Sequence, residues 1–103
     1  MDFGVVFVTC SPKQASEIAR AVVESKLAAC VNVIPNVTSV YTWQGKVEED
    51  QESLLVMKTR EELFERLKEK ILNIHSYDLP EIIFLPIKSG HQPYLEWISQ
   101  STG

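Results

Sequence analysis

Four side chains that could bind a metal ion or a polar ligand lie in one short segment: His75, Tyr77, Asp78 and Glu81. They belong to the stretch NIHSYDLPEIIFLP, whose polar half precedes an apolar, strand-like half. An imidazole nitrogen beside a carboxylate is a common donor set for transition metals. A histidine near the end of a helix is explained equally well by the helix dipole. A ligand site and a capping or interface role therefore both remain open.

A second candidate is the acidic row Glu48, Asp50 and Glu52, which would share one face of a strand because alternate residues point the same way. Three carboxylates in line could gather hard divalent cations. Alternating charge on a projecting strand is also typical of a solvated face that prevents uncontrolled edge pairing. We favour the solvated face, since Lys46 opposite these acids would weaken a cation site.

Patterns typical of catalysis are absent, with no nucleophile elbow, phosphate-binding loop or CxxC pair in the sequence. His91 lies in the loop segment SGHQP and is expected at the surface. Cys10 and Cys30 both stand in apolar, strand-like settings, which favours two buried thiols over a disulfide. We expect a binding protein with no catalytic residues, not an enzyme.

The composition limits the class of protein and its partners. The 103 residues fit a single domain, residues 1–103, and 45% hydrophobic with 23% charged residues is typical of a globular protein. A net charge of -4 disfavours nucleic acid and acidic lipid as partners. Because no apolar run is long enough to cross a membrane and the N-terminus MDFGVVFVTC lacks a basic region, we expect a cytoplasmic protein.

The elements that would position these residues follow from hydrophobic periodicity. Two all-apolar runs, residues 3–9 and 81–87, predict strands that are buried on both faces. A helix is expected to run from Pro12 to about Ser25, and a second helix follows Thr59. Both helices are preceded by the pattern of a capping box, Ser11 with Gln14 and Thr59 with Glu62.

Between the helices, two long strands around the turn QGK predict a long hairpin, and YLEWIS predicts a short C-terminal helix. Pro35 requires that the first hairpin strand lie at a sheet edge or bend through a bulge. The order β-α-β-β-α-β predicts an α+β, ferredoxin-like sandwich, in which two helices cover one face of a four-stranded antiparallel sheet.

The hairpin is about twice the usual strand length, so its end should project past the helices as an arm. Tyr41, Trp43 and Val47 would then expose apolar surface beside unpaired edge groups of the backbone. Pairing with further copies of the chain would cover both. We therefore expect a homo-oligomer whose interface includes these three residues.

Three segments together resemble the CutA family of divalent-cation tolerance proteins: LAACVNVIPNVTSVYTWQGKVEEDQESLLVMKT, HSYDLPEIIFLPI and YLEWI. The resemblance covers nearly the whole chain. It implies a ferredoxin-like homotrimer whose arms pair between subunits, and a role in tolerance of copper and other divalent metals without an established enzymatic reaction.

The resemblance also implies site residues. The family motif His-Pro-Tyr-Glu-x-Pro-Glu is matched by His75, Tyr77, Pro80 and Glu81, with Ser76 and Asp78 at the two substituted positions. Metal ligands proposed in the family are histidines of this motif and a cysteine at the exit of the first strand. The residues implied for Cu²⁺ or another divalent cation are His75, Glu81 and Cys10, although Cys10 stands one place beyond the matching position, which Thr9 occupies.

Two functions follow as alternatives. The first is a metal-responsive, copper-binding protein, which the resemblance favours. The second is a trimeric signalling or scaffold protein that binds a small anion or a partner at the cleft between subunits, where Lys58, Tyr77 and Glu81 would form a polar pocket.

Overall fold

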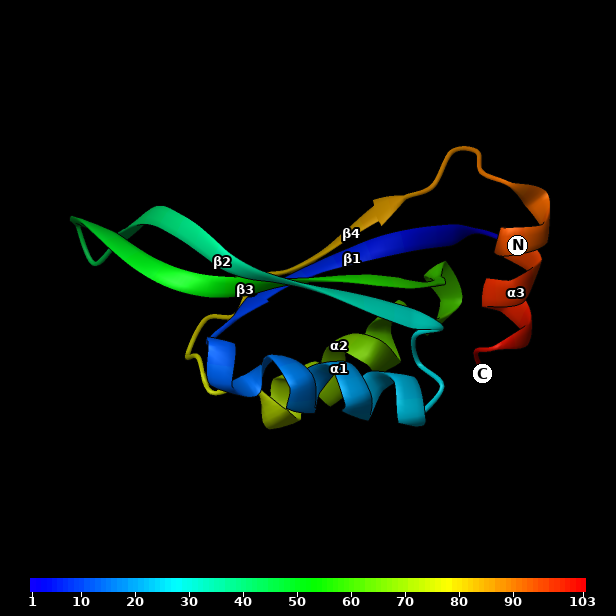
Figure 1. Ribbon diagram of the computed structural model, residues 1–103, viewed down its shortest axis with the longest axis horizontal. Helices are drawn as coiled ribbons and strands as arrows, with labels where there is room; N and C mark the ends of the chain where they lie inside the picture. The colour runs from blue at the N-terminus through cyan, green and yellow to red at the C-terminus, as the bar shows by residue number, and fades with distance from the viewer.

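The protein consists of one four-stranded antiparallel sheet and three helices (Figure 1). The computed structural model describes residues 1–103. The strand order in the sheet is β2-β3-β1-β4, and every neighbouring pair is antiparallel. The strands are β1 (Phe3–Cys10), β2 (Cys30–Trp43), β3 (Lys46–Arg60) and β4 (Ile82–Pro86). The helices are α1 (Ala15–Glu24), α2 (Phe64–Ile74) and α3 (Gln92–Gln100). The predicted order of elements is confirmed.

Helices α1 and α2 lie against one face of the sheet and form the core with it (Figure 1). The core exists because alternate residues of β1 and β3 point toward the helices, whose apolar residues recur at helical spacing. None of the helices is long and apolar enough to cross a membrane. The side chains buried in this core with no exposed surface include Val6, Val8, Cys10, Ile18, Val22, Leu55, Met57, Leu67 and Ile71.

The opposite face of the sheet is not covered within the chain. Strand β1 alternates between buried and half-buried residues, so only one of its faces is fully buried. Strand β4 is an edge strand, and its Ile83 and Leu85 are 49% and 41% exposed. The prediction that both apolar runs are buried on both faces is therefore wrong for the single chain. The uncovered residues form an apolar surface, which we call the open face: Val5, Phe7, Ile34, Leu54, Val56, Ile83 and Leu85.

Strands β2 and β3 pair along most of their length and extend well beyond the helices as an arm (Figure 1). The arm contributes to a long dimension of 44 Å in a molecule whose other dimensions are 25 and 22 Å. Gln44 and Gly45 form the two-residue turn at its tip, and both have positive φ. Pro35 lies in edge strand β2 at a β-bulge, because the pairing register shifts between Ile34 and Val37. The predicted long hairpin and its bulge are confirmed.

Neither predicted capping box forms, and two of the four side chains, those of Thr59 and Gln14, bond to other elements instead. Thr59 donates its hydroxyl to the carbonyl of Leu27 at 2.6 Å, which fastens β3 to the segment after α1. Gln14 donates to the carbonyl of Ile74 at 2.8 Å and accepts from the backbone N–H of Ser76 at 3.0 Å. Gln14 therefore holds the loop after α2, the loop that carries the polar motif.

Candidate ligand-binding cleft

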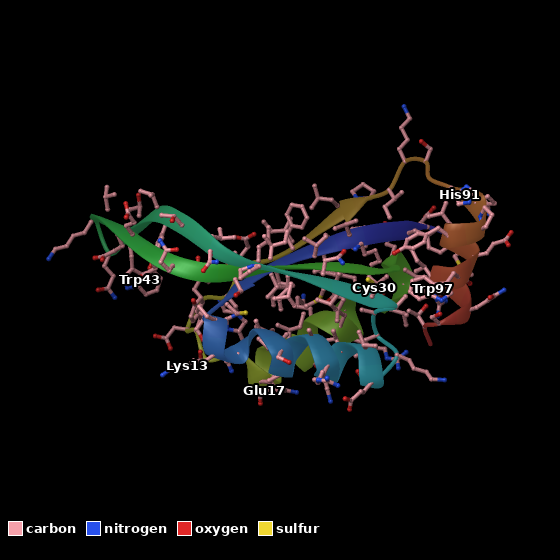
Figure 2. The ribbon with its side chains drawn as sticks, in the orientation of Figure 1. Lys13, Glu17, Cys30, Trp43, His91 and Trp97 are labelled. Carbon is pink, nitrogen blue, oxygen red and sulfur yellow. The ribbon has the colours of Figure 1, made fainter.

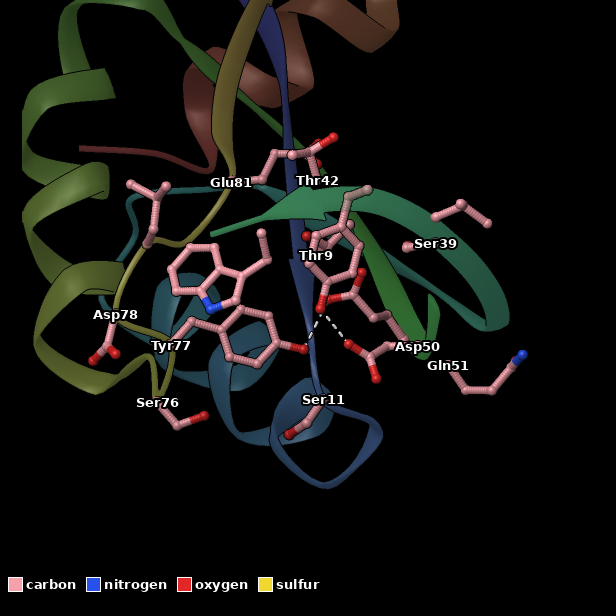
Figure 3. A pocket seen from close by; sticks show the side chains of 15 residues that line it. Thr9, Ser11, Ser39, Thr42, Asp50, Gln51, Ser76, Tyr77, Asp78 and Glu81 are labelled. Atoms are coloured by element: carbon pink, nitrogen blue, oxygen red, sulfur yellow. Dashed lines mark hydrogen bonds between the residues drawn. The ribbon is translucent and has the colours of Figure 1, made fainter. Parts of the chain in front are cut away.

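A cleft of about 890 Å³ lies between the arm and residues 75–81, the loop that joins α2 to β4. One wall comes from the facing side chains of β2 and β3, and the other from the loop and the end of β1 (Figure 3). Clefts of about 300–1,000 Å³ are usual for small-molecule sites. The lining residues are Thr9, Ser11, Ser39, Val40, Tyr41, Thr42, Trp43, Asp50, Gln51, Glu52, Ser76, Tyr77, Asp78, Leu79 and Glu81.

His75 fastens the loop to the sheet through both ring nitrogens. Its Nε2 lies 2.8 Å from the carbonyl oxygen of Thr9, and its Nδ1 accepts the backbone N–H of Tyr77 at 3.1 Å. Since Nδ1 accepts, Nε2 carries the proton and donates it to Thr9. The imidazole ring also packs against the ring of Tyr77, with centroids 4.7 Å apart. These contacts determine where Tyr77 enters the cleft.

Two tyrosines of the cleft donate hydrogen bonds to two carboxylates of β3 (Figure 3). Tyr77 bonds Glu52 Oε2 at 2.7 Å across the cleft, and Tyr41 bonds Asp50 within the arm. Glu52 is only 7% exposed, and Tyr77 is its single hydrogen-bond partner. No fully buried side-chain oxygen of the protein lacks a partner, so the second oxygen of Glu52, a residue that lines the cleft, is accessible.

The charge in the cleft is entirely acidic. Asp50, Glu52, Asp78 and Glu81 line it, and no Lys, Arg or His does. Both ion pairs of the protein, Arg60–Glu62 and Lys68–Glu65, lie elsewhere. Burial and the nearby charge of Glu52 raise the pKa of Glu81 above its usual range. This lining would attract a cation and repel an anion.

The same environment favours the protonated form of the phenols that line the cleft. Burial, followed by the hydrogen bond to Glu52, raises the pKa of Tyr77 well above its usual value. The hydrogen bond to Asp50 raises the pKa of Tyr41 to about 12. Both hydroxyls therefore remain hydrogen-bond donors at neutral pH.

The residues predicted to ligate a metal are not brought together. Glu81 lines the cleft, His75 lies behind the loop with both nitrogens occupied, and Cys10 is fully buried in the core. Burial, with a smaller contribution from Glu52, raises the pKa of the Cys10 thiol to about 11, so it is protonated and a poor ligand at neutral pH. No three His, Cys, Asp or Glu side chains are grouped to hold a metal ion.

The predicted polar pocket of Lys58, Tyr77 and Glu81 is also divided within the chain. Tyr77 and Glu81 line the cleft, whereas Lys58 bonds Asn32 and lies 3.9 Å from the sulfur of Cys30. Cys30 is half-buried rather than buried, and it lies toward the end of the molecule occupied by α3, away from Trp43 on the arm (Figure 2). Within one chain, Lys58 therefore does not share a pocket with Tyr77 and Glu81.

The residues predicted for the oligomer interface do not all lie in the cleft. Tyr41 and Trp43 line it, whereas Val47 does not and is 77% exposed. The sequence interpretation considered Glu52 as one of three carboxylates that could gather a divalent cation, but it favoured a solvated face, whereas Glu52 is only 7% exposed. The pattern that could have indicated this is the alternation of β3: Glu52 points to the same side of the strand as Leu54 and Val56, so the acidic row continues into the sheet.

A hard, hydrated divalent cation suits this donor set better than copper held by His and Cys. Mg²⁺ or Mn²⁺ keeps most of its water and uses only one or two carboxylates. Asp50 and Glu52 present carboxylate oxygens to the cleft, and serine and threonine hydroxyls stand beside them. The set formed by His75, Cys10 and Glu81 does not fit a copper ion, because neither the imidazole nor the thiol has a free donor.

A comparison of the sequence with models of known protein families identifies the family of this chain. The family model described as CutA1 divalent ion tolerance protein matches residues 4–101. The chain belongs to the CutA1 family. It is 50% identical to the divalent-cation tolerance protein CutA of Thermus thermophilus over 96% of this chain and 97% of that protein. It is 52% identical to human Protein CutA over 93% of this chain, but it spans only 54% of the human protein. It likewise spans only 55% of mouse Protein CutA.

Solved structures of the CutA1 family share the whole fold. The T. thermophilus structure superposes with a TM-score of 0.95 at 49% identity and covers 98% of this chain and 99% of that chain. The structure of CutA1 from Oryza sativa gives a TM-score of 0.97 at 46% identity and covers 100% of this chain and 95% of that chain. The long arm and the loop at its base therefore belong to a fold that this family shares.

Proposed function

We propose that this CutA1-family protein serves the tolerance of divalent cations as a ferredoxin-like, cytoplasmic homotrimer that binds a cationic ligand in the cleft. In this proposal it is a binding protein, not an enzyme. The observation that carries it is Glu52, a carboxylate that is 7% exposed and lacks a basic partner. Glu52 lines a cleft in which every charged residue is acidic. A nearly buried carboxylate without an oppositely charged partner is costly, so binding of a cation to its accessible oxygen is favoured.

The homotrimer is supported by what the single chain leaves uncovered. The open face exposes Ile34, Ile83 and Leu85 by more than two fifths each, and β2 and β4 both have an unpaired edge. Exposed apolar surface next to free strand edges favours association with further copies. The number of three subunits is taken from the resemblance to the CutA family. Tyr41, Trp43 and Val47 of the arm remain our proposed interface residues. Since Tyr41 and Trp43 also line the cleft, the cleft would lie at the boundary between two subunits of the proposed homotrimer.

A calorimetric titration of MnCl₂ tests the cationic ligand. We expect binding at a dissociation constant of about 10⁻⁴–10⁻³ M, as for sites with few fixed ligands. Glu52→Gln, which keeps the side-chain shape, should abolish the heat, while Glu69→Gln on the exposed surface of α2 should leave it unchanged. Equal heats in wild type and Glu52→Gln would contradict the proposal.

The function that the resemblance favoured, copper binding through His75, Glu81 and Cys10, requires donor atoms that the fold occupies or buries, and it is tested separately. Titration of copper(II) into wild type and His75→Ala separates it from the cleft. A tight copper(II) site that disappears in His75→Ala, together with an unchanged Mn²⁺ heat in Glu52→Gln, would favour copper binding.

A further inference from the structure

The cleft contains aromatic surface that a hydrated metal ion would not use. Tyr41, Trp43 and Tyr77 line it together with the carboxylates. Trp43 is 38% exposed and Tyr41 is 40% exposed, so neither ring is buried in the core of the chain. Aromatic faces attract cations and pack against alkyl chains, and both contributions grow where water is excluded. The walls therefore suit a cation that has an apolar body.

The size of the cleft leads to the same class of ligand. A volume of about 890 Å³ exceeds what one hydrated ion needs and is typical of sites for small organic molecules. The carboxylates belong to two walls, with Glu52 on the arm and Glu81 on the loop. Burial and, to a smaller extent, the charge of Glu52 raise the pKa of the Glu81 carboxyl, so both carboxylates favour a positive charge in the cleft. A ligand with positive charge between the walls stabilises both.

An ammonium group satisfies the free oxygen of Glu52 better than a neutral donor does. It provides three N–H donors and a full charge, and hydrogen bonds between charged partners are about twice as strong as neutral ones. Because Glu52 is held in place by Tyr77 and is almost fully buried, its side chain loses little conformational freedom when an ammonium group binds to it.

We propose that the cleft binds an organic ammonium compound with a short alkyl chain, whose charged nitrogen bonds Glu52 and whose chain lies against Trp43 and Tyr77. This inference rests on the proposed function only in that both use the same cleft. It names an organic ligand class in addition to a hydrated divalent cation.

The test is a calorimetric titration of 1,4-diaminobutane into the full chain. 1,4-Butanediol serves as the uncharged ligand of the same length, and MgCl₂ at matched ionic strength serves as the metal ligand. We expect Glu52→Gln to weaken diamine binding at least tenfold, and Glu69→Gln to leave it unchanged. Glu81→Gln is a second variant for the case that Glu52→Gln proves unstable, since Glu81 is exposed and its substitution does not endanger folding. We expect Glu81→Gln to weaken diamine binding as well.

The outcomes separate the two proposals. Diamine binding that depends on Glu52, with no binding of the diol, supports the inference. Equal binding of diamine and diol, or diamine binding unchanged in Glu52→Gln and Glu81→Gln, overturns it. Metal binding that depends on Glu52 without any diamine binding overturns the inference and leaves the proposed function standing. If neither ligand binds, as when a neighbouring subunit fills the cleft, both fall.

Discussion

The hydroxyl of Tyr77 donates a 2.7 Å hydrogen bond to Glu52 Oε2 and so joins the loop after α2 to strand β3. This bond spans the two walls of the cleft, and it is the only hydrogen bond that Glu52 receives. The position of the carboxylate therefore depends on the loop. A disturbance of the loop should reach the cleft even where the substituted residue does not line it.

Removing this hydroxyl should destabilise the fold. Tyr77→Phe leaves the almost buried Glu52 carboxylate without its donor, and we expect the free energy of unfolding to fall by about 1–3 kcal/mol. Urea denaturation followed by circular dichroism measures it. Tyr41→Phe is the control, since the Tyr41–Asp50 bond is exposed and its loss should have a smaller effect. A larger loss for Tyr41→Phe would mean that the Tyr77 bond does not secure the loop.

His75 should behave as a structural residue. His75→Ala removes one bond to the Thr9 carbonyl and one from the Tyr77 N–H, so we expect a loss of about 1–3 kcal/mol in stability. His91→Ala is the matched control, because His91 is exposed before α3 and makes no side-chain capping bond. Thermal unfolding of both variants decides the question. A stability of His75→Ala equal to that of wild type would contradict the clamping role.

Ionisation of the Cys10 thiol should lower the free energy of unfolding at alkaline pH. Its pKa is about 11 in the folded protein and 9.0 when unperturbed, so between these values the folded state keeps a proton that the unfolded state releases. The contribution is fully present below pH 9.0 and is lost as the pH rises toward about 11. At about 1.36 kcal/mol per pKa unit, the full difference is roughly 3 kcal/mol.

Denaturation of wild type and Cys10→Ala at several pH values isolates this contribution from that of the tyrosines. The stability of wild type should decline more steeply with pH in this interval. Parallel curves for the two proteins would show that Cys10 does not titrate as described.

A charge on the open face should break up the oligomer. Ile83→Lys places an ammonium on the uncovered side of edge strand β4, and we expect smaller species in analytical ultracentrifugation. Leu72→Lys is the control, because Leu72 is also 49% exposed but lies on α2. Dissociation of both variants, or of neither, would argue against the open face as the interface.

Local patterns in the sequence predicted the elements, but not how distant segments meet. The alternation of Val6 and Val8, the helical spacing of Ile18 and Val22, and the turn at Gly45 each depend on neighbouring residues, and the structure confirms the elements they indicate. Gln14 was misinterpreted because its partners, the carbonyl of Ile74 and the N–H of Ser76, come from the far end of α2.

The site was predicted in part for the same reason. Tyr77 and Glu81 stood out through their motif and do line the cleft. Glu52 was assigned to a solvated face, because its burial results from the loop folding against the arm, a contact between segments that are distant in the sequence. The absence of a free donor atom on His75 and Cys10 likewise results from tertiary contacts that the sequence does not reveal.

The most direct test of the central claim, that cations bind at Glu52 in the cleft, is paramagnetic broadening by Mn²⁺ in the ¹H–¹⁵N spectrum of the deuterated protein. We predict that substoichiometric Mn²⁺ first broadens the amides of Asp50, Glu52 and Tyr77, and that Glu52→Gln abolishes this selectivity. Broadening that begins instead at the exposed acids of α2, such as Glu65 and Glu69, with no change in Glu52→Gln, would contradict the claim.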